Sequence, residues 1–253
     1  MLQYPATITL AEGHRPLNMK LPPVWHGQAK LCYAFRWRND DDLAFLIGHL
    51  PEGAAVIDVG ANIGTWTLLM AHKTGRNGTV VASEPTADTF RTLVANIRMN
   101  DMSNVRLHRV ALSDSVGTSR LYHDMDGTRN SLGHTRSAVT DFEEVATLTL
   151  DQLVKQERLT RVDFIKIDVE GAEPLVLAGA REAISSYRPV ILFEINESAM
   201  RALNFAADSA WAILRNHQYR FYQLTEGSIL IRVLECPRSG NVWAFPEKTD
   251  PWA

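Results

Sequence analysis

Residues 54–64 read AAVIDVGANIG, and this stretch decides the fold because a short apolar run passes directly into a glycine turn. Gly60 and Gly64 let the backbone approach a ligand where a Cβ would collide. A helix predicted from about Thr65 to Lys73 follows, so its free backbone N–H groups would point into the same crevice. Asp58, at the end of the strand, can accept hydrogen bonds from loop amides or from a cationic ligand group. The stretch therefore predicts a ligand-binding turn at the carboxyl end of a buried strand.

Downstream of this turn, short apolar runs alternate with helical segments, which is the pattern of a parallel sheet covered by helices on both faces. The further runs that predict strands are GTVVASEP, NVRLHRVALSD, VATLTL, VDFIKIDVEG, PVILFEIN, YRFYQL, SILIRVL and NVWAFP. We therefore expect one α/β domain over residues 51–253. Residues 1–50 are expected to form an N-terminal extension that covers the sheet or contributes to a substrate lid. Within it, residues 24–37 predict a hairpin, and DDDLAFLIGHL predicts a helix capped by an aspartate.

Composition narrows the class of protein. The 253 residues are 45% hydrophobic and carry a net charge of −3, so no basic patch indicates a nucleic-acid partner. Cys32 and Cys236 show no CxxC spacing, which argues against a zinc site or a disulfide framework and favours a reducing compartment. The N-terminus lacks the basic start and apolar stretch of a secretory signal, and no apolar run is long enough for a membrane span. The expectation is a cytoplasmic protein.

The second predicted strand ends in Ser83-Glu84-Pro85, which places the carboxylate of Glu84 beside the glycine turn. An acid at this position in doubly wound folds binds the two ribose hydroxyls of an adenosine. The glycine spacing is Gly-x-x-x-Gly, with Asn62 where the dinucleotide fingerprint Gly-x-Gly-x-x-Gly has its middle glycine. Together the turn and the acid favour nucleoside binding, and they leave NAD and S-adenosylmethionine as the alternatives.

The strand predicted over the run VDFIKIDVEG ends in Asp168, and Glu170 follows two residues later. Because ligands of open α/β sheets bind outside the carboxyl ends of the strands, Asp168 should face the crevice beside the cofactor. Lys166 lies within the same apolar run and needs a partner, for which Asp168 and Glu194 are the candidates. An internal salt bridge is the favoured interpretation of Lys166, ahead of a catalytic lysine.

Four motifs within residues 52–200 resemble, in order, those of the FkbM family of S-adenosylmethionine-dependent methyltransferases. They are DVGANIGTWT, SEPTADTFRTLVANIRMN, VALSDSVG and DFIKIDVEGAEPLVLAGA. The resemblance implies a Rossmann-like class I methyltransferase fold, a mostly parallel sheet of seven strands whose C-terminal hairpin includes the only antiparallel one. It also implies a set of cofactor-binding residues, with the last two near the adenine: Asp58, Gly60, Asn62, Gly64, Glu84, Ser113 and Asp114.

Methyl transfer to an alcohol needs a group that takes the hydroxyl proton, and a nearby carboxylate can do this. Asp168 is the candidate base, supported by Glu170 and Glu194. A divalent metal could instead orient the hydroxyl, and Asp168, Glu194 and Asn196 form an oxygen-rich set suited to Mg²⁺. The run Glu-Ile-Asn at positions 194–196, in place of adjacent acids, speaks against the metal.

The predicted function is an S-adenosylmethionine-dependent O-methyltransferase whose acceptor is a hydroxyl of a sugar, a glycan or a natural product. A nicotinamide-dependent oxidoreductase is the main alternative, disfavoured by the glycine pattern and by the lack of a Tyr-x-x-x-Lys set. A non-catalytic nucleoside-binding module is the other. Acceptor contacts are expected from the N-terminal segment and from inter-strand loops. Arg129 and His134 lie in the loop over residues 124–137, and for them a substrate contact and a solvent-exposed position are equal alternatives.

Overall fold

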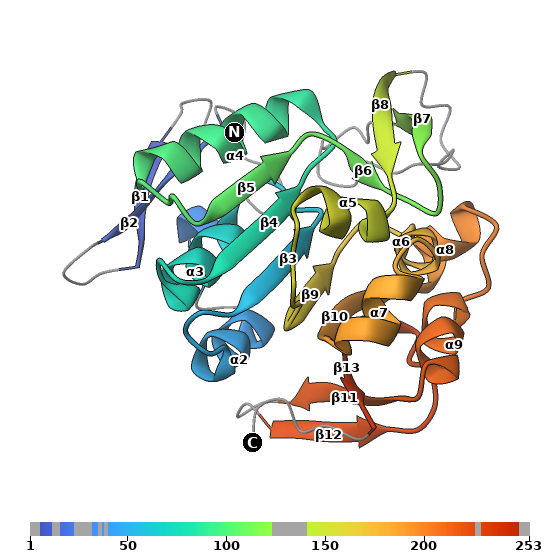
Figure 1. Cartoon of the computed structure of the whole chain (residues 1–253). Helices are drawn as coiled ribbons and strands as arrows, with labels where there is room; N and C mark the ends of the chain where they lie inside the picture. Colours follow the sequence, from blue (N-terminus) through green and yellow to red (C-terminus); the bar gives the residue numbers. More distant parts are fainter. Residues whose placement is uncertain are drawn as a thin grey trace.

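A computed structural model describes residues 6–11, 16–22, 32–34, 37, 40–122, 141–225 and 229–247. Its centre is an eight-stranded sheet with the strand order β12-β11-β13-β10-β9-β3-β4-β5 (Figure 1). In chain order these strands are β3 (Ala55–Val59), β4 (Thr79–Ser83), β5 (Val105–His108), β9 (Phe164–Ile167), β10 (Val190–Asn196), β11 (Tyr219–Thr225), β12 (Ile229–Val233) and β13 (Ser239–Pro246).

Strands β3, β4, β5, β9 and β10 are parallel neighbours, so their carboxyl ends lie at one edge of the sheet. The chain runs outward from β3 through β4 to β5 and then continues on the other side of β3 with β9 and β10. This reversal of direction is a topological switch point, where the loops after β3 and β9 diverge and leave room for a ligand.

The α/β prediction is confirmed, but the expectation of seven strands with a single antiparallel one is wrong. β13 is antiparallel to β10 and β11, and β12 adds an eighth strand antiparallel to β11.

The predicted third strand also divides, because β5 ends at His108 and β6 (Ala111–Leu112) joins a different sheet. That smaller sheet has the order β6-β8-β7, with β7 at Gly117–Tyr122 and β8 at Phe142–Leu148.

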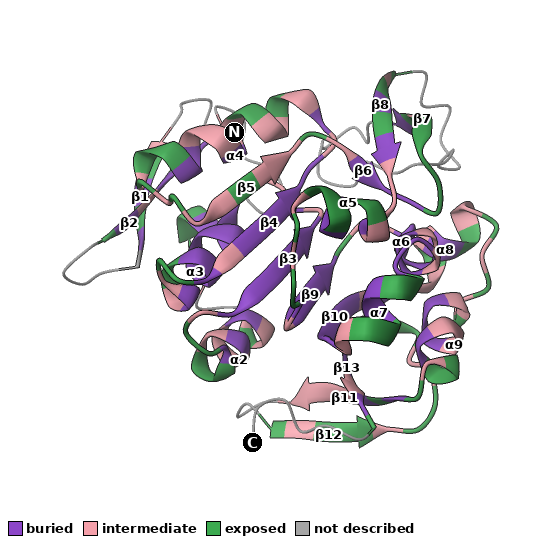
Figure 2. Ribbon diagram, in the orientation of Figure 1, coloured by how far each residue is buried: buried purple, intermediate pink, exposed green. Residues whose placement is uncertain are grey.

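The sheet separates two hydrophobic cores, because alternate side chains of each buried strand point to opposite faces. Val56 of β3 belongs to the first core and Ile57 to the second, and Phe164 and Ile165 of β9 divide in the same way. Strands β3, β4 and β9 are buried along most of their length (Figure 2). Helices α2 (Asp41–His49), α3 (Thr65–Thr74) and α4 (Ala87–Met99) contribute to the first core. Helices α5 (Leu150–Gln156), α6 (Glu173–Ala178), α7 (Arg181–Tyr187), α8 (Glu197–Ala202) and α9 (Ser209–Asn216) contribute to the second.

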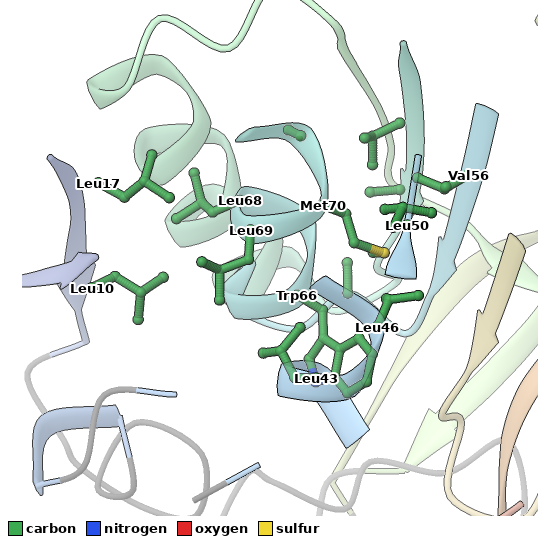
Figure 3. Close-up of a cluster of buried hydrophobic side chains, with 14 of the residues drawn as sticks. Leu10, Leu17, Leu43, Leu46, Leu50, Val56, Trp66, Leu68, Leu69 and Met70 are labelled. Atoms are coloured by element: carbon green, nitrogen blue, oxygen red, sulfur yellow. The ribbon is translucent and has the colours of Figure 1, made fainter. Parts of the chain in front are cut away.

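Helix α2 begins as predicted after an aspartate, since the Asp40 carboxylate accepts a hydrogen bond from the Leu43 N–H at 3.0 Å. Its buried side chains Leu43 and Leu46 lie close to Trp66 of α3 in the first core (Figure 3). The predicted hairpin over residues 24–37 is wrong where the structure describes that segment, because residues 32–34 are helical.

A hairpin instead forms upstream, from β1 (Ala6–Ala11) and β2 (Leu17–Leu21). Two asparagines of α4 hold β2 by its backbone. Asn96 accepts from the Lys20 N–H at 2.7 Å, and Asn100 accepts from the Asn18 N–H at 2.8 Å. Asn96 also donates to the Ile63 carbonyl at 2.8 Å, so one buried amide joins the N-terminal hairpin to the glycine turn. Among the described residues, no helix is long and apolar enough to cross a membrane.

Candidate active site

The glycine turn after β3 is pinned to the neighbouring strand, since the N–H groups of Gly60 and Ala61 both donate to the Ser83 carbonyl at 3.0 Å. Gly60 has φ +76°, and a Cβ there would lie 1.9 Å from the backbone oxygen of Asp168. Gly64 has φ +98°, and its Cβ would meet the Leu93 side chain at 2.6 Å. Both positions therefore favour glycine for backbone conformation, and at Gly60 the Asp168 backbone also leaves no space for a side chain.

A hydrogen bond joins Asn62 of this turn to Glu84, the residue that follows β4. Asn62 adopts the left-handed conformation with φ 50°, and its side-chain oxygen accepts from the Ile63 N–H at 2.8 Å. Its backbone N–H donates to Glu84 Oε2 at 3.0 Å, while Glu84 Oε1 accepts from the Thr86 N–H at 2.9 Å. The two amides orient the carboxylate, and a carboxylate has further lone pairs for hydroxyl donors. Burial raises the pKa of Glu84, and the hydrogen bonds to Thr86 and Asn62 oppose that rise.

Asp58 is fully buried and does not contact the loop amides in the described structure. Its Oδ2 accepts from the Thr67 hydroxyl at 2.6 Å, and its Oδ1 lies 3.7 Å from Lys166 Nζ. The carboxylate thus fastens the first turn of α3 to β3. Burial raises the pKa of Asp58, and Lys166 and the Thr67 hydroxyl act in the opposite direction.

Lys166 forms the predicted internal salt bridge, with Asp168 as one of its partners. Its Nζ lies 3.1 Å from Asp168 Oδ2 and 5.6 Å from the centre of the Trp66 ring. Burial lowers the pKa of Lys166, but the carboxylates of Asp168 and Asp58 together hold it above its ordinary value. The ammonium group therefore stays charged and links Asp58 of β3 to Asp168 after β9.

Three acids meet at the carboxyl ends of β9 and β10. Asp168, Glu170 and Glu194 each offer a carboxylate oxygen, and these oxygens lie within 4.8 Å of one another. We call these three residues the acid cluster. The Asp168 side chain is 45% exposed, so part of its carboxylate is open to solvent. Asn196, the predicted third metal ligand, uses its side-chain oxygen to accept from the Ala199 N–H and from the Ser198 hydroxyl, at 3.2 and 2.8 Å.

Ser113 and Asp114 follow β6 of the smaller sheet. The Ser113 N–H donates to the Leu148 carbonyl at 2.9 Å, and its own carbonyl lies against Gly179 at the end of α6. These contacts fix the backbone after β6, and an adenine contact here stays a prediction. Arg129 and His134 lie outside the described residues.

Sequence reasoning missed two interactions that brace the site, made by the buried Glu173 and by the half-buried Asp40. Glu173 Oε1 accepts from the N–H groups of Val169 and Gly171, at 3.1 and 3.3 Å, and burial raises its pKa to about 8. Asp40 accepts from the Trp66 indole N–H at 3.0 Å, and burial raises its pKa to about 6. The position of Glu173 in the first turn of a helix was a usable signal, because an acid there can bind loop amides. Nothing local indicates that Asp40 meets Trp66, 26 residues away.

The sequence profile of the methyltransferase FkbM domain matches residues 58–221, which include the glycine turn, Glu84 and the acid cluster. The chain belongs to this family. It is 28% identical over 199 residues to the 31-O-demethyl-FK506 methyltransferase FkbM of Streptomyces tacrolimicus, covering 67% of this chain and 74% of that protein. It is 30% identical over 157 residues to the hexuronic acid methyltransferase AglP of Haloferax volcanii, covering 61% of each chain.

A solved structure of methyltransferase FkbM from Methylobacillus flagellatus shares the fold, with a TM-score of 0.51 and 20% identity over 77% of this chain and 44% of that chain. The predicted class I methyltransferase fold is therefore confirmed. The aligned part of this chain spans 63% and 61% of two of its curated relatives, less than two thirds of their length.

Proposed function

We propose that this chain binds S-adenosylmethionine and catalyses transfer of its methyl group to a hydroxyl oxygen of a sugar, glycan or natural-product acceptor. One observation carries the proposal: the backbone of Gly60 lies so close to Asp168 that a Cβ on Gly60 would be 1.9 Å from the backbone oxygen of Asp168. The cofactor turn and the candidate base are thus in direct contact at the switch point. A base beside the transferred group is the arrangement that an alcohol methylation needs.

The residues present fit the cofactor. S-adenosylmethionine supplies an activated methyl group when bound. Gly60 and Gly64 carry no side chain that would block a ligand, and α3 begins directly after Gly64, so its first N–H groups have no partner within the helix. Glu84, oriented by two backbone amides, can accept hydrogen bonds from ribose hydroxyls. The same set would also suit other adenosine ligands, and the family of the chain favours the methyl donor over NAD.

Asp168 is proposed to take the proton of the acceptor hydroxyl. Lys166 holds one carboxylate oxygen at 3.1 Å, which orients the group and leaves the other oxygen for the acceptor. Glu170 and Glu194 line the same opening and can accept hydrogen bonds from neighbouring hydroxyls. Glu173 accepts hydrogen bonds from the N–H groups of Val169 and Gly171, and these two contacts fix the backbone on either side of Glu170.

The hydrogen bonds of Asp168 and Asn196 favour Asp168 as a base over a Mg²⁺ site. Lys166 already pairs with Asp168, and a second cation against the same carboxylate would be repelled. Asn196 is engaged in capping α8 and would have to give up that hydrogen bond to become a ligand. We therefore expect turnover to persist in EDTA.

The class of acceptor is supported by relatives rather than by contacts. Two relatives are a hexuronic acid methyltransferase and a 31-O-demethyl-FK506 methyltransferase, so related chains act on a sugar acid and on a natural product. A panel of sugars and hydroxylated natural products is the matching acceptor screen.

Calorimetry with S-adenosylmethionine and with NAD on the purified chain tests the cofactor. We expect binding of S-adenosylmethionine alone. Binding of NAD in its place would favour the oxidoreductase alternative and overturn the proposal.

Asp168→Asn tests the base with a side chain of the same shape. Turnover should fall by about 10²- to 10⁴-fold, since this is the typical contribution of a general base. Cofactor affinity should stay within a few-fold of the wild type. Asp101→Asn, at an exposed position after α4, is the matched control and should leave both quantities unchanged. Unchanged turnover in Asp168→Asn would remove Asp168 as the base.

A further inference from the structure

A pocket of about 520 Å³ opens beside the end of β10, between the start of α8 and the start of β13. Its polar lining comes from Asn196, Glu197, Ser198, Arg201, Arg238 and Ser239. The rim is held by backbone contacts, because the Glu197 N–H donates to the Arg238 carbonyl at 3.3 Å. β10 and β13 also pair Asn196 with Ser239 across this end of the sheet.

The lining of this pocket is rich in cationic hydrogen-bond donors. Glu197 is its one carboxylate, and Arg201 pairs with it. The guanidinium of Arg238 makes no hydrogen bond or ion pair with any residue in the described part of the chain, and it is exposed. With Glu197 neutralised by Arg201, the pocket carries one uncompensated positive charge. The planar fork of an unpaired guanidinium can donate two parallel hydrogen bonds to two oxygens of a carboxylate or of a phosphate.

The pocket is adjacent to the acid cluster. Glu194 and Asn196 lie two positions apart on β10 and point to the same side of the strand, a separation of about 7 Å. The loop of Glu170 also packs on α8, since a Cβ at Gly171 would meet the Ala199 backbone at 2.6 Å. An acceptor with its hydroxyl at Asp168 can therefore extend into the pocket.

We propose that this pocket binds an anionic group, a carboxylate or a phosphate, on the methyl acceptor, with Arg238 as the principal contact. The inference rests on the proposed methyltransferase function and adds a substrate class to it. The acid cluster repels an anion while Arg238 attracts one, so the two ends of the site fix which way the acceptor lies. The hydroxyl end meets Asp168 and the anionic end meets Arg238.

Three sugars that differ in charge test this inference: methyl glucoside, glucuronic acid and glucose 1-phosphate. Their binding is measured by saturation-transfer NMR, and their methylation by initial rates with S-adenosylmethionine. At least one charged sugar should bind about tenfold or more tightly than the glucoside, as a charge-assisted hydrogen bond provides. The charged sugar that binds more tightly than the glucoside shows whether the pocket prefers a carboxylate or a phosphate.

Arg238→Gln should raise the Kd and KM of that charged sugar by about tenfold or more, with kcat changed only a few-fold. Arg238→Lys should recover part of the loss, because it keeps the charge but not the planar fork. Arg232→Gln, on exposed β12, is the matched control and should change nothing. Equal binding of charged and uncharged sugars, or no effect of Arg238→Gln, would overturn the inference.

Cofactor binding separates this inference from the proposed function. If S-adenosylmethionine binds and the sugars show no dependence on charge, the inference fails while the methyltransferase proposal stands. If S-adenosylmethionine does not bind, the proposed function fails, and the NMR measurement still decides whether the pocket takes an anion.

Discussion

Gly60 and Gly53 share a backbone φ of +76°, yet their surroundings differ. A Cβ at Gly53 would have nothing within 4 Å, whereas one at Gly60 would lie 1.9 Å from the Asp168 oxygen. The pair thus separates two reasons for glycine. At Gly53 the requirement is the left-handed backbone alone, and at Gly60 it is also the contact between two strand ends.

We expect Gly60→Ala to cost far more than Gly53→Ala. Gly53→Ala, the control, should lose about 1–2 kcal/mol of unfolding free energy, because an alanine is less stable in the left-handed conformation than a glycine. Gly60→Ala must add the displacement of the Asp168 backbone, so it should lose more stability and also weaken cofactor binding. Chemical denaturation and calorimetry on both variants measure this. Equal losses in the two variants would show that the contact with Asp168 is not tight.

At the scale of elements, the loop between β9 and α6 depends on one buried acid. Glu173 belongs to the first turn of α6 and accepts from two N–H groups of the preceding loop, while its Oε2 has no hydrogen-bond partner among the described residues. With its pKa raised from 4.5 to about 8, it keeps a proton in the folded protein that the unfolded chain releases. Its contribution to stability is therefore full below about pH 4.5 and is lost as the pH rises toward about 8.

Glu173→Gln should remove this pH dependence, because glutamine keeps an acceptor oxygen and does not titrate. The unfolding free energy of the wild type should fall relative to the variant between pH 5 and pH 8.5, as measured by urea denaturation at both values. Glu52→Gln, at an exposed position, should follow the wild type at every pH. A constant difference between Glu173→Gln and wild type would contradict the assignment.

Elements of strong periodicity could be predicted from the sequence, and long-range pairings could not. The runs around Ile57 and Ile165 are apolar except for one charged residue each, Asp58 and Lys166, and turns bound them, so β3 and β9 could be predicted. β5 and β6 were merged, because only the choice of sheet separates them. The hairpin β1–β2 went unrecognised, since it depends on asparagines of α4 that lie 76 and 82 residues away. The acid cluster was foreseen for Asp168, Glu170 and Glu194, because adjacent parallel strands end at one edge.

At the scale of the molecule, α2 ties the N-terminal extension to both halves of the sheet. Asp40 holds Trp66 beside Lys166, and Asp42 accepts from the Trp243 indole N–H at 2.6 Å and from the Asn241 amide at 2.7 Å. Asn241 in turn pairs with Glu194 across β13 and β10. The extension is therefore coupled to the acid cluster as well as to the first core.

Two core variants should separate stability from function. Leu46→Ala in the first core and Ile184→Ala in the second remove fully buried side chains, and each should cost about 2–5 kcal/mol of unfolding free energy. Leu46→Ala should also lower turnover, because the N-terminal end of α2 holds two side chains near the acid cluster. Asp40 holds Trp66, and Asp42 holds Asn241, which pairs with Glu194 across the sheet. Ile184→Ala should leave turnover near wild type well below its melting temperature. Loss of turnover in both variants would show that the site responds to stability alone.

The division of the molecule into two cores has a practical consequence for anyone who wishes to improve the protein as a catalyst. Charged groups such as Asp58, Lys166 and Asp40 cluster toward α2 and α3, while α7 and α9 pack on the opposite face. Stabilising substitutions usually cost activity where they stiffen a working site. Helix α7 packs on α5 and carries none of the residues assigned to the site, so thermal tolerance can be raised there first, and acceptor range altered afterwards in a more stable protein.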